Sequence, residues 1–328
     1  MIKYKSMNND IISSSPILSI CIPTYNRSGY LDKTIKSIVM NDVFINTNKI
    51  QLVISNNNST DNTDEICKKY ADQYPTKIKY IKQPYNIFAD EHIFLVPTFA
   101  DGKYIKINND TCMFKEKTLL NLLCLLHEYT NADMLFLSNS NGVKQKSNMC
   151  YTLNELISCT SYNLTWIGGL MMKNTLFKEM MINGKFQKYI HTKLPQIYIY
   201  AEALERNYQV LYNNEEFFSI LYPTNKGGYN ISKVFGFNYL SILKKYVGRY
   251  NGLSHSTFRI EKKRVIDFIN YYYFDFKNQF SFYKTGYFVY LLPFYKLNLY
   301  FWEKYIVCVF KKIIFSIKKF LSSLLKLK

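Results

Sequence analysis

The sequence contains little glycine and proline and no pairing pattern among its cysteines. Only 12 Gly and 8 Pro occur among 328 residues, while 48% of the residues are hydrophobic. This composition excludes low-complexity and collagen-like chains, and a chain of this length can bury one large core and a smaller appendage. The seven cysteines are odd in number and include no C-x-x-C pair. We therefore expect reduced core thiols instead of disulfides or a zinc site.

The first 15 residues lack the features of a secretory signal. They are polar and contain no apolar stretch followed by a cleavage site of small residues. We therefore expect a flexible N-terminus over residues 1–15 and a protein that stays in the cytoplasm.

Acidic residues are scarce, above all in the last third of the chain. The whole chain carries 42 Lys and Arg against 24 Asp and Glu, a net charge of +18. From residue 233 to the end, 18 basic residues stand against 4 acidic ones, a net charge of +14. Such a basic region can bind nucleic acid or an anionic membrane surface, or it can serve solubility alone.

A buried strand leads into a polar loop near the N-terminus. The residues Leu18–Ile22 are apolar or small, which suits a strand covered on both faces, and we expect Pro23 to end its pairing. The loop is Thr24-Tyr25-Asn26-Arg27, and the spacing of apolar residues predicts a helix over 30–40. In open α/β sheets ligands bind at the carboxyl ends of the strands, so this loop is a candidate binding site.

Two further apolar runs end in polar loops of the same kind. The run 51–54 precedes 55–63, a stretch dominated by Asn, Ser and Thr. The run 102–107 precedes Asn108-Asn109-Asp110, in which Asp110 is the only carboxylate. These runs predict two more strands that end at a ligand-binding edge.

Helices and strands alternate through the middle of the chain. The periodicity predicts helices over 63–74 and 115–129 and strands over 77–81 and 134–137. This alternation indicates an α/β fold.

Together these segments resemble the nucleotide-binding half of the family 2 glycosyltransferases with the GT-A fold. In that family a P-T-Y-N-R loop is followed by a loop of the S-D-N-x-S-x-D-x-T kind and by a G-x-Y-I-x-x-x-D-D segment. The resemblance covers roughly residues 17–212. It implies a GT-A domain, Rossmann-like and suited to nucleotide-diphospho-sugars, over residues 16–228, followed by a helical, basic and amphipathic region over residues 229–328.

The resemblance implies a nucleotide-sugar donor bound where these loops meet. The segment 83–93 looks like the family's N-x-G-x-D-x-N segment, with Phe88 where Gly is usual and His92 where Asn is usual. Asn57 takes the place of a side chain that reads the base, while Asn56 shapes the turn. The donor-binding residues implied in this way are Pro23, Thr24, Tyr25, Arg27, Asn56, Asn57, Asp90 and Asn109.

The resemblance also implies a divalent metal ion, Mn²⁺ or Mg²⁺, between the enzyme and the diphosphate. Asp110 is the implied ligand, because such ions take hard oxygen ligands and offset the charge that grows on the leaving group. Only Asp110 is left as a carboxylate, while Asn108 and Asn109 are neutral, so we expect weak metal binding that depends on the nucleotide. The alternative is a solvated turn capped by Asn and Asp.

The pattern does not fix the catalytic base. Inverting members of the family carry an E-D pair shortly before an aromatic residue, and counting back from Tyr208 places Pro195 and Gln196 on that pair. Gln cannot take up a proton. The catalytic candidates are therefore Gln196 by position, His191 because histidine titrates near neutral pH, and Glu202 on the following helix.

An aromatic residue and two glycines mark a candidate acceptor site. Trp166 could stack on the apolar face of a sugar, and Gly168 and Gly169 would let the backbone approach it closely. The alternative is a glycine-rich strand edge with a tryptophan in the core.

The last segment, 299–328, combines lysines with large apolar residues. Lys304, Lys311 and Lys318 recur at a spacing of seven, as do Lys312, Lys319 and Lys326, which draws two adjoining stripes on one helical face. This pattern predicts a basic amphipathic helix lying on an anionic membrane surface without spanning it. The alternative is a helix packed on its own domain or on a second subunit.

The sequence as a whole favours an inverting, metal-dependent glycosyltransferase. It would move a sugar from a nucleotide-diphosphate donor to a growing capsule or lipopolysaccharide, bound as a glycan or lipid-linked glycan, at the cytoplasmic face of the membrane. A catalytically inactive, sugar-binding or scaffolding relative is an alternative, suggested by Gln196 and the Asn-rich loop. A basic nucleic-acid-binding protein is disfavoured, because the aromatic-rich C-terminal helices contain no recognition motif and we expect no nucleic-acid partner.

Overall fold

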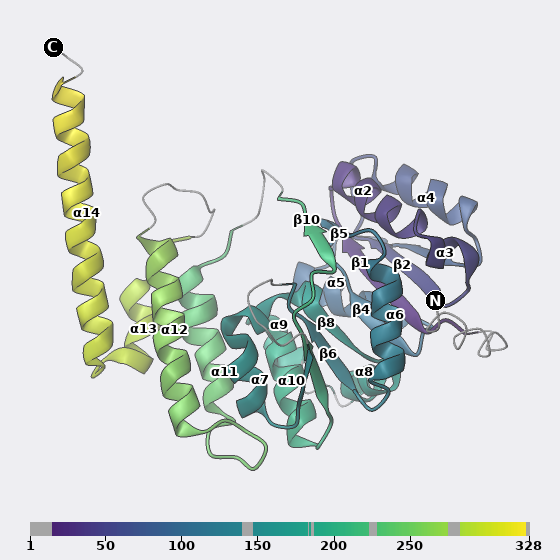
Figure 1. Cartoon of the computed structure of the whole chain (residues 1–328). Helices are drawn as coiled ribbons and strands as arrows, with labels where there is room; N and C mark the ends of the chain where they lie inside the picture. The colour runs from purple at the N-terminus through teal and green to yellow at the C-terminus, as the bar shows by residue number, and fades with distance from the viewer. Residues whose placement is uncertain are drawn as a thin grey trace.

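The computed structural model describes residues 15–139, 147–182, 184, 187–222, 228–274 and 283–325. They form an α/β part built on one large sheet and a helical C-terminal part beside it (Figure 1). The N-terminus predicted over residues 1–15 lies, except for Ser15, outside the described residues.

Eight strands form the sheet, in the order β3-β2-β1-β4-β8-β6-β9-β7. The first four of these pair in parallel, β8 runs antiparallel between β4 and β6, and β6 pairs in parallel with β9. Two short strands, β5 and β10, form a separate antiparallel ribbon. The strand bounds are β1 Leu18–Thr24, β2 Ile50–Asn56, β3 Ile78–Lys82, β4 Tyr104–Ile107, β5 Cys112–Phe114, β6 Met134–Leu137, β7 Ser147–Cys150, β8 Leu170–Lys173, β9 Val210–Asn213 and β10 Phe218–Ile220.

Helices cover both faces of the sheet. Successive strand residues point to opposite faces, so Ile20 and Ile22 of β1 join one apolar cluster and Cys21 joins the other. The face of Ile20 is covered by α2 Ser28–Val39, α3 Asp42–Asn46, α4 Thr63–Gln73 and α6 Thr118–Glu128. The face of Cys21 is covered by α5 Ala89–Leu95, η2 Val96–Phe99, α7 Leu153–Thr160, α8 Asn174–Ile182, α9 Gln187–Ile190 and α10 Pro195–Glu205. Two short helical turns, η3 Ser161–Thr165 and η4 Ile167–Gly169, lead into β8.

The predicted strands and helices of this part are confirmed, but the role expected for Pro23 is wrong. Pairing of β1 with β2 continues through Pro23 to Thr24, whereas pairing with β4 ends at Cys21. The backbone of Cys21 faces β4 and that of Thr24 faces β2, as their carbonyl bonds to Asn108 and Asn57 show. The missing N–H of Pro23 therefore points to the side where pairing has already stopped.

The C-terminal part consists of helices, as predicted. They are η5 Ser232–Tyr239, a π-helix, α11 Leu240–Lys244, α12 His255–Tyr273, α13 Tyr287–Tyr295 and α14 Leu299–Leu325. The helix α12 packs on α7 and η3, and its buried residues belong to the same apolar cluster as those of α7 and α10. The domain boundary at residue 228 stays a prediction.

The last helix, α14, is packed at its beginning and exposed along the rest. Phe301 is fully buried and Trp302 and Tyr305 pack against the core, whereas large apolar side chains from Ile306 to Leu321 are exposed. Figure 1 shows the C-terminal end of α14 clear of the other elements. Among the described residues, no helix is both long enough and apolar enough to cross a membrane.

All seven cysteines are free, and Cys21, Cys67, Cys112 and Cys150 are buried. These four meet the expectation of thiols in the core, whereas Cys124 and Cys308 are half-buried and Cys159 is exposed.

Candidate functional site

The loops after β1 and β2 are joined into one rim at the carboxyl edge of the sheet. The backbone N–H of Asn57 donates to the carbonyl of Thr24 (2.9 Å), that of Asn26 donates to Ser59 Oγ (2.9 Å), and Asn26 Oδ1 accepts from Thr60 N–H (2.8 Å). Asn26 has a positive φ of 49°, a conformation that Asn tolerates better than most residues. These bonds hold the two loops in fixed register.

Asp110 lies beneath this rim, after β4, and is only 3% exposed. Its Oδ2 accepts from Thr24 Oγ1 (3.0 Å) and its Oδ1 accepts from Arg27 Nη1 (2.9 Å). Burial raises the pKa of Asp110 above its usual value, and the charge of Arg27 opposes this rise. The structure thus brings three predicted site residues into contact, and both carboxylate oxygens of Asp110 are engaged.

A buried lysine stands beside the same loop. Lys106 of β4 donates from Nζ to Asn108 Oδ1 (2.8 Å) and to the carbonyls of Gly168 (2.9 Å) and Ile107 (3.2 Å). Its ammonium also lies 4.3 Å from the ring centroid of Phe218. Burial lowers the pKa of Lys106 to about 8. Sequence reasoning missed this residue, although a lysine within the apolar run Tyr104–Ile107 was a visible signal.

Asn108 is committed to its own turn as well as to Lys106. Its Nδ2 donates to the carbonyls of Asn109 (3.0 Å) and Cys112 (2.9 Å). The side-chain oxygen, as described above, already accepts from an ammonium group. Asn108 therefore has no free oxygen directed at a ligand.

The contacts of Asn108 and Asp110 do not fit a divalent metal ion. Mg²⁺ and Mn²⁺ need several hard oxygen ligands. Here the amide oxygen of Asn108 is bonded to Lys106, and the oxygens of Asp110 are bonded to Thr24 and Arg27. Within the described ranges, no group of three or more His, Cys, Asp and Glu residues is arranged to hold a metal ion.

Asn57 holds the loop that follows β3. Its Nδ2 donates to the carbonyl of Ile87 (2.8 Å) and its Oδ1 accepts from the Ile87 N–H (2.8 Å). Asn86 Nδ2 adds a bond to the Asn57 carbonyl (3.2 Å). Asn56 is buried next to it, where Nδ2 donates to the Tyr80 hydroxyl (3.1 Å). Both amides therefore shape the rim, and Asn57 positions the covering loop.

Asp90 and His191 lie in one cluster although they are far apart in the sequence. Asp90 is in the first turn of α5, its carboxylate 4.0 Å from Lys193 Nζ. The buried Oδ2 of Asp90 makes no hydrogen bond to any residue that the structure describes. Burial raises the pKa of Asp90, and the charges of Lys193 and His191 oppose this rise. The His191 ring lies 6.0 Å from that of Phe88.

The other two catalytic candidates lie elsewhere. Gln196 is buried in the first turn of α10 and donates from Nε2 to the Thr165 carbonyl (2.6 Å). Glu202 pairs with Arg206 (2.8 Å) near the end of α10. Because α10 ends just before β9 begins, Glu202 lies towards the amino edge of the sheet, away from the loops described above.

The remaining predicted donor residues are accessible to different degrees. The Tyr25 side chain is exposed at the rim, while Pro23 and Asn109 are half-buried.

A cavity of about 250 Å³ opens where β6 ends. Its lining residues come from the loop after β6, η3 and its C-cap, β10, η5 and α12: Ser138, Asn139, Tyr162, Asn163, Thr165, Trp166, Ile220, Phe235 and Phe268. Trp166 thus borders a cavity, as the acceptor hypothesis requires. The two glycines are explained by packing, because a Cβ at Gly168 would lie 2.7 Å from the Trp166 ring and one at Gly169 would lie 2.6 Å from the Phe136 ring.

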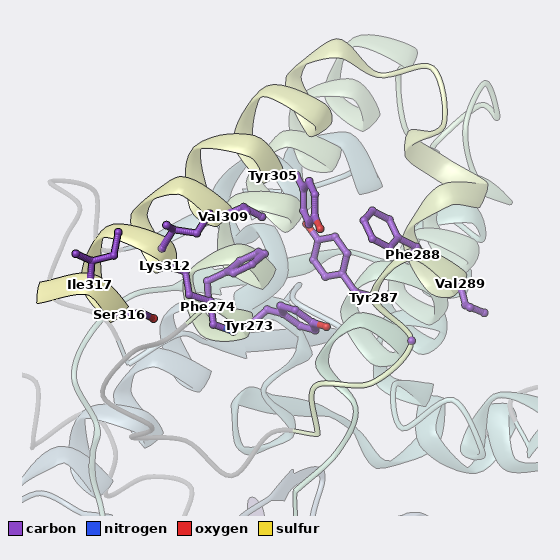
Figure 2. Close-up of a pocket in the computed structure, with 12 residues that line it drawn as sticks. Tyr273, Phe274, Tyr287, Phe288, Val289, Tyr305, Val309, Lys312, Ser316 and Ile317 are labelled. Atoms are coloured by element: carbon purple, nitrogen blue, oxygen red, sulfur yellow. The ribbon is translucent and has the colours of Figure 1, made fainter. Parts of the chain in front are cut away.

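A second, larger groove of about 780 Å³ lies between α12, α13 and α14. Figure 2 shows aromatic side chains from all three helices around it, among them Phe274, Tyr287 and Tyr305. Lys312 of α14 adds a basic group to this apolar lining. The groove belongs to the helical part, whereas the loops of the rim belong to the sheet.

Residues 19–143 match the family model described as "Glycosyl transferase family 2". The minor teichoic acid biosynthesis protein GgaB of Bacillus subtilis is 26% identical over 259 residues, which are 74% of this chain and 27% of that protein. The abequosyltransferase RfbV of Salmonella typhimurium is 31% identical over 117 residues, 35% of this chain and 33% of that protein. The chain thus spans 27% to 33% of the length of these relatives.

Solved structures share the fold at low sequence identity. TarS 1–349 of S. aureus in complex with UDP superposes with a TM-score of 0.53 and 16% identity over 80% of this chain and 73% of that chain. The mannosyltransferase PcManGT from Pyrobaculum calidifontis, in complex with GDP-Man and Mn²⁺, gives a TM-score of 0.53 and 11% identity over 82% and 76%. With the sheet order, these likenesses show a GT-A fold with a helical C-terminal part, in which residues 19–143 match the model of glycosyl transferase family 2.

Proposed function

We propose that the protein transfers a sugar from a nucleotide-diphosphate donor to a growing cell-surface glycan, such as capsule, lipopolysaccharide or teichoic acid. The family match and the names of the two relatives support this reaction class. The observation that carries the proposal is the convergence of the loops after β1, β2 and β4 on one sheet edge, where Thr24, Arg27 and Asp110 are in contact.

In the proposed complex the donor diphosphate lies beside Arg27. A guanidinium group can pair with two phosphate oxygens at once, and that of Arg27 is fixed by Asp110. The base of the nucleotide lies against the loop that Asn57 holds through Ile87. Solved structures of similar fold are complexes with UDP, UDP-GlcNAc and GDP-Man, which supports a nucleotide-sugar donor here.

Transfer is proposed to proceed by inversion at the anomeric carbon. The acceptor hydroxyl oxygen bonds to that carbon while the bond from the carbon to the diphosphate oxygen breaks. The hydroxyl proton passes to the imidazole of His191, since Gln196 cannot accept one and Glu202 is held by Arg206 towards the other edge of the sheet. The proposed mechanism contains no metal-bound step, because Asp110 is bonded to Arg27 and Thr24 and the side-chain oxygen of Asn108 is bonded to Lys106.

The acceptor end of the glycan is proposed to enter the cavity beside Trp166. An aromatic ring there can stack on a sugar, and Ser138 and Asn163 add polar side chains to the lining, while the amide of Asn139 holds the backbone of Phe218. This arrangement of apolar walls with a few polar groups is typical of ligand sites.

We further propose that α14 contacts the cytoplasmic face of the membrane without spanning it. Its exposed apolar residues, among them Phe310, Ile314 and Phe320, are interspersed with exposed lysines. Anionic lipid attracts such lysines, and the apolar side chains can bury themselves in the interface. The same mixture of charge and large apolar residues favours lipid over nucleic acid as the anionic partner.

A catalytically inactive, sugar-binding protein is the second candidate. The observation that favours it is the buried Gln196, whose amide is used to hold the Thr165 carbonyl where the family has a carboxylate. Such a protein would bind nucleotide sugars or glycans without turnover.

A thermal-shift screen with nucleotide sugars, followed by an assay for nucleoside diphosphate release, separates the two candidates. A true donor stabilises the folded state by its own binding energy. We expect one donor to raise Tm and to be consumed when a glycan acceptor is present. His191→Gln should lower kcat by about a hundredfold or more and leave the donor Kd unchanged, while the exposed control His255→Gln should change neither. Binding of a donor without any release of nucleoside diphosphate would favour the inactive candidate.

A further inference from the structure

We infer that this site neutralises the donor diphosphate with the guanidinium of Arg27 in place of a divalent metal ion. The inference rests on the proposed function and concerns the same site. It departs from the metal dependence that the GT-A resemblance implies, and it follows from what occupies the oxygen atoms of the loop after β4.

The first observation is that Asp110 is already neutralised. Its two oxygens accept from Thr24 and Arg27 at 3.0 Å and 2.9 Å, and the carboxylate is almost completely buried. A metal ion bound to Asp110 would have to displace the guanidinium or share the carboxylate with it. Two cations around one carboxylate repel each other, and the repulsion is strong where water is excluded.

The second observation is a further positive charge beside the loop after β4. The ammonium of Lys106 lies 2.8 Å from Asn108 Oδ1 and is fully buried. Burying an ammonium group is costly unless oxygen atoms surround it, and three of them do so here. Lys106 thus uses the Asn108 oxygen and places a buried cation beside the loop that carries Asp110.

The third observation is that Arg27 has donors left for a ligand. A guanidinium carries five N–H groups, and one of its nitrogens bonds to Asp110. The Arg27 side chain is 37% exposed, so the rest of the fork can reach solvent or a phosphate. Arg27 directly precedes α2, and a Cβ at Gly29 in the first turn of that helix would meet no atom within 4 Å. The first N–H of α2, that of Ser28, already donates to Asp61 Oδ2 (2.9 Å), so the guanidinium of Arg27 is the group left to receive a phosphate here.

Together these contacts make Asp110 a positioning residue. It fixes the plane of the guanidinium at the rim, and Thr24 holds the second oxygen of the carboxylate. The charge that develops on the leaving diphosphate then falls on a preorganised cation, which is the task that a metal ion performs in other enzymes.

The test is calorimetric binding of UDP and of GDP to the full-length protein, with EDTA and with Mn²⁺. We expect the tighter of the two nucleotides to bind with the same Kd, within about twofold, under both conditions. Arg27→Gln should weaken binding about tenfold or more, because a charge-assisted bond to phosphate is lost. The matched control Lys33→Gln, which removes an exposed charge from α2, should leave Kd unchanged.

Two further measurements keep the inference open to refutation. Electron paramagnetic resonance of Mn²⁺ should show no ion bound to the protein beyond what free nucleotide binds. Thermal melting of Arg27→Gln should show a folded protein, and Arg27→Lys should recover part of the affinity if the variant with Gln is unstable. Binding that requires Mn²⁺, or Mn²⁺ held in an Asp110-dependent way, would overturn the inference and leave the proposed function standing. If neither nucleotide binds under any condition, the proposed function fails and this inference falls with it.

Discussion

The buried histidine of α5, His92, makes the folded protein less stable in acid. His92 Nε2 lies 2.8 Å from Ser55 Oγ, and Gln83 Nε2 donates to the same hydroxyl (2.9 Å). These contacts tie α5, which carries Asp90, to the end of β2. No charged group belongs to this hydrogen-bonded set, and burial lowers the pKa of His92 from 6.5 to about 4.

The change in the free energy of unfolding with pH follows from the difference between the His92 pKa in the folded and in the unfolded chain. Above pH 6.5 His92 is neutral in both the folded and the unfolded chain, and the folded state keeps its full stability. As pH falls from 6.5 to about 4, the unfolded chain takes up a proton that the folded chain does not, so the free energy of unfolding decreases. The loss reaches about 2 kcal/mol by about pH 5 and about 3 kcal/mol by about pH 4.

Urea unfolding of the wild type and of His92→Asn at about pH 7.5 and about pH 5 measures this effect. Asn can still bond to Ser55 but does not titrate, so the variant should lose about 2 kcal/mol less than the wild type on acidification. The carboxyl groups titrate in both proteins and cancel in the difference. His127→Asn, at an exposed position on α6, is the control and should follow the wild type. Parallel losses in the wild type and His92→Asn would refute the reasoning.

Three further predictions concern other parts of the molecule. Asn57→Ala should weaken nucleotide binding more than Asn56→Ala, because it removes two bonds to Ile87, worth about 1 kcal/mol each; equal Kd values in calorimetry would contradict this. As pH rises from about 8 to 10.5 the wild type should gain stability relative to Lys106→Met in urea titrations, because burial lowers the pKa of Lys106 in the folded chain, while the cysteines and tyrosines titrate in both proteins and cancel; no difference between the two proteins would contradict this. Removal of residues 311–328 should abolish flotation with anionic vesicles and leave the melting temperature nearly unchanged. Removal of the whole helix from Leu299 onwards should lower the melting temperature, because the buried Phe301 is lost. Equal stability of the two truncated proteins would show that α14 contributes nothing to the core.

The meeting of the β1, β2 and β4 loops was predictable because carboxyl ends of parallel strands share one edge. Each of these strands was visible as an apolar run that ended in polar residues. The contact of Asp110 with Thr24 follows from that topology. The contact with Arg27 does not, because it depends on the rotamer of a long side chain in a loop. A sequence that shows a lone carboxylate cannot say whether a metal ion or a guanidinium accompanies it.

The cluster of Asp90, His191 and Lys193 could not be read from the sequence for a different reason. It joins the start of α5 to the turn before α10, and the two segments meet only through the packing of their helices on the same face of the sheet. His191 could be named as a candidate because it lies near Gln196 in the sequence and histidine titrates near neutral pH. Lys193 could not be named, because nothing in the sequence distinguishes it among the 42 Lys and Arg residues of the chain.

The helix α14 shows why an amphipathic pattern leaves its partner open. Apolar residues recur along almost the whole of 299–325, yet Phe301 lies in the core and Phe320 is exposed. The difference arises from the neighbours of each half: Tyr287 and Tyr295 stack on Phe301, whereas the described helices end before they reach the last turns of α14. Packing on its own domain therefore describes the first turns of α14, and the membrane contact that we propose concerns only the later turns. Because the lysines at 311, 312, 318 and 319 fall in the second half, the charge and the uncovered apolar surface coincide where a lipid interface would need both.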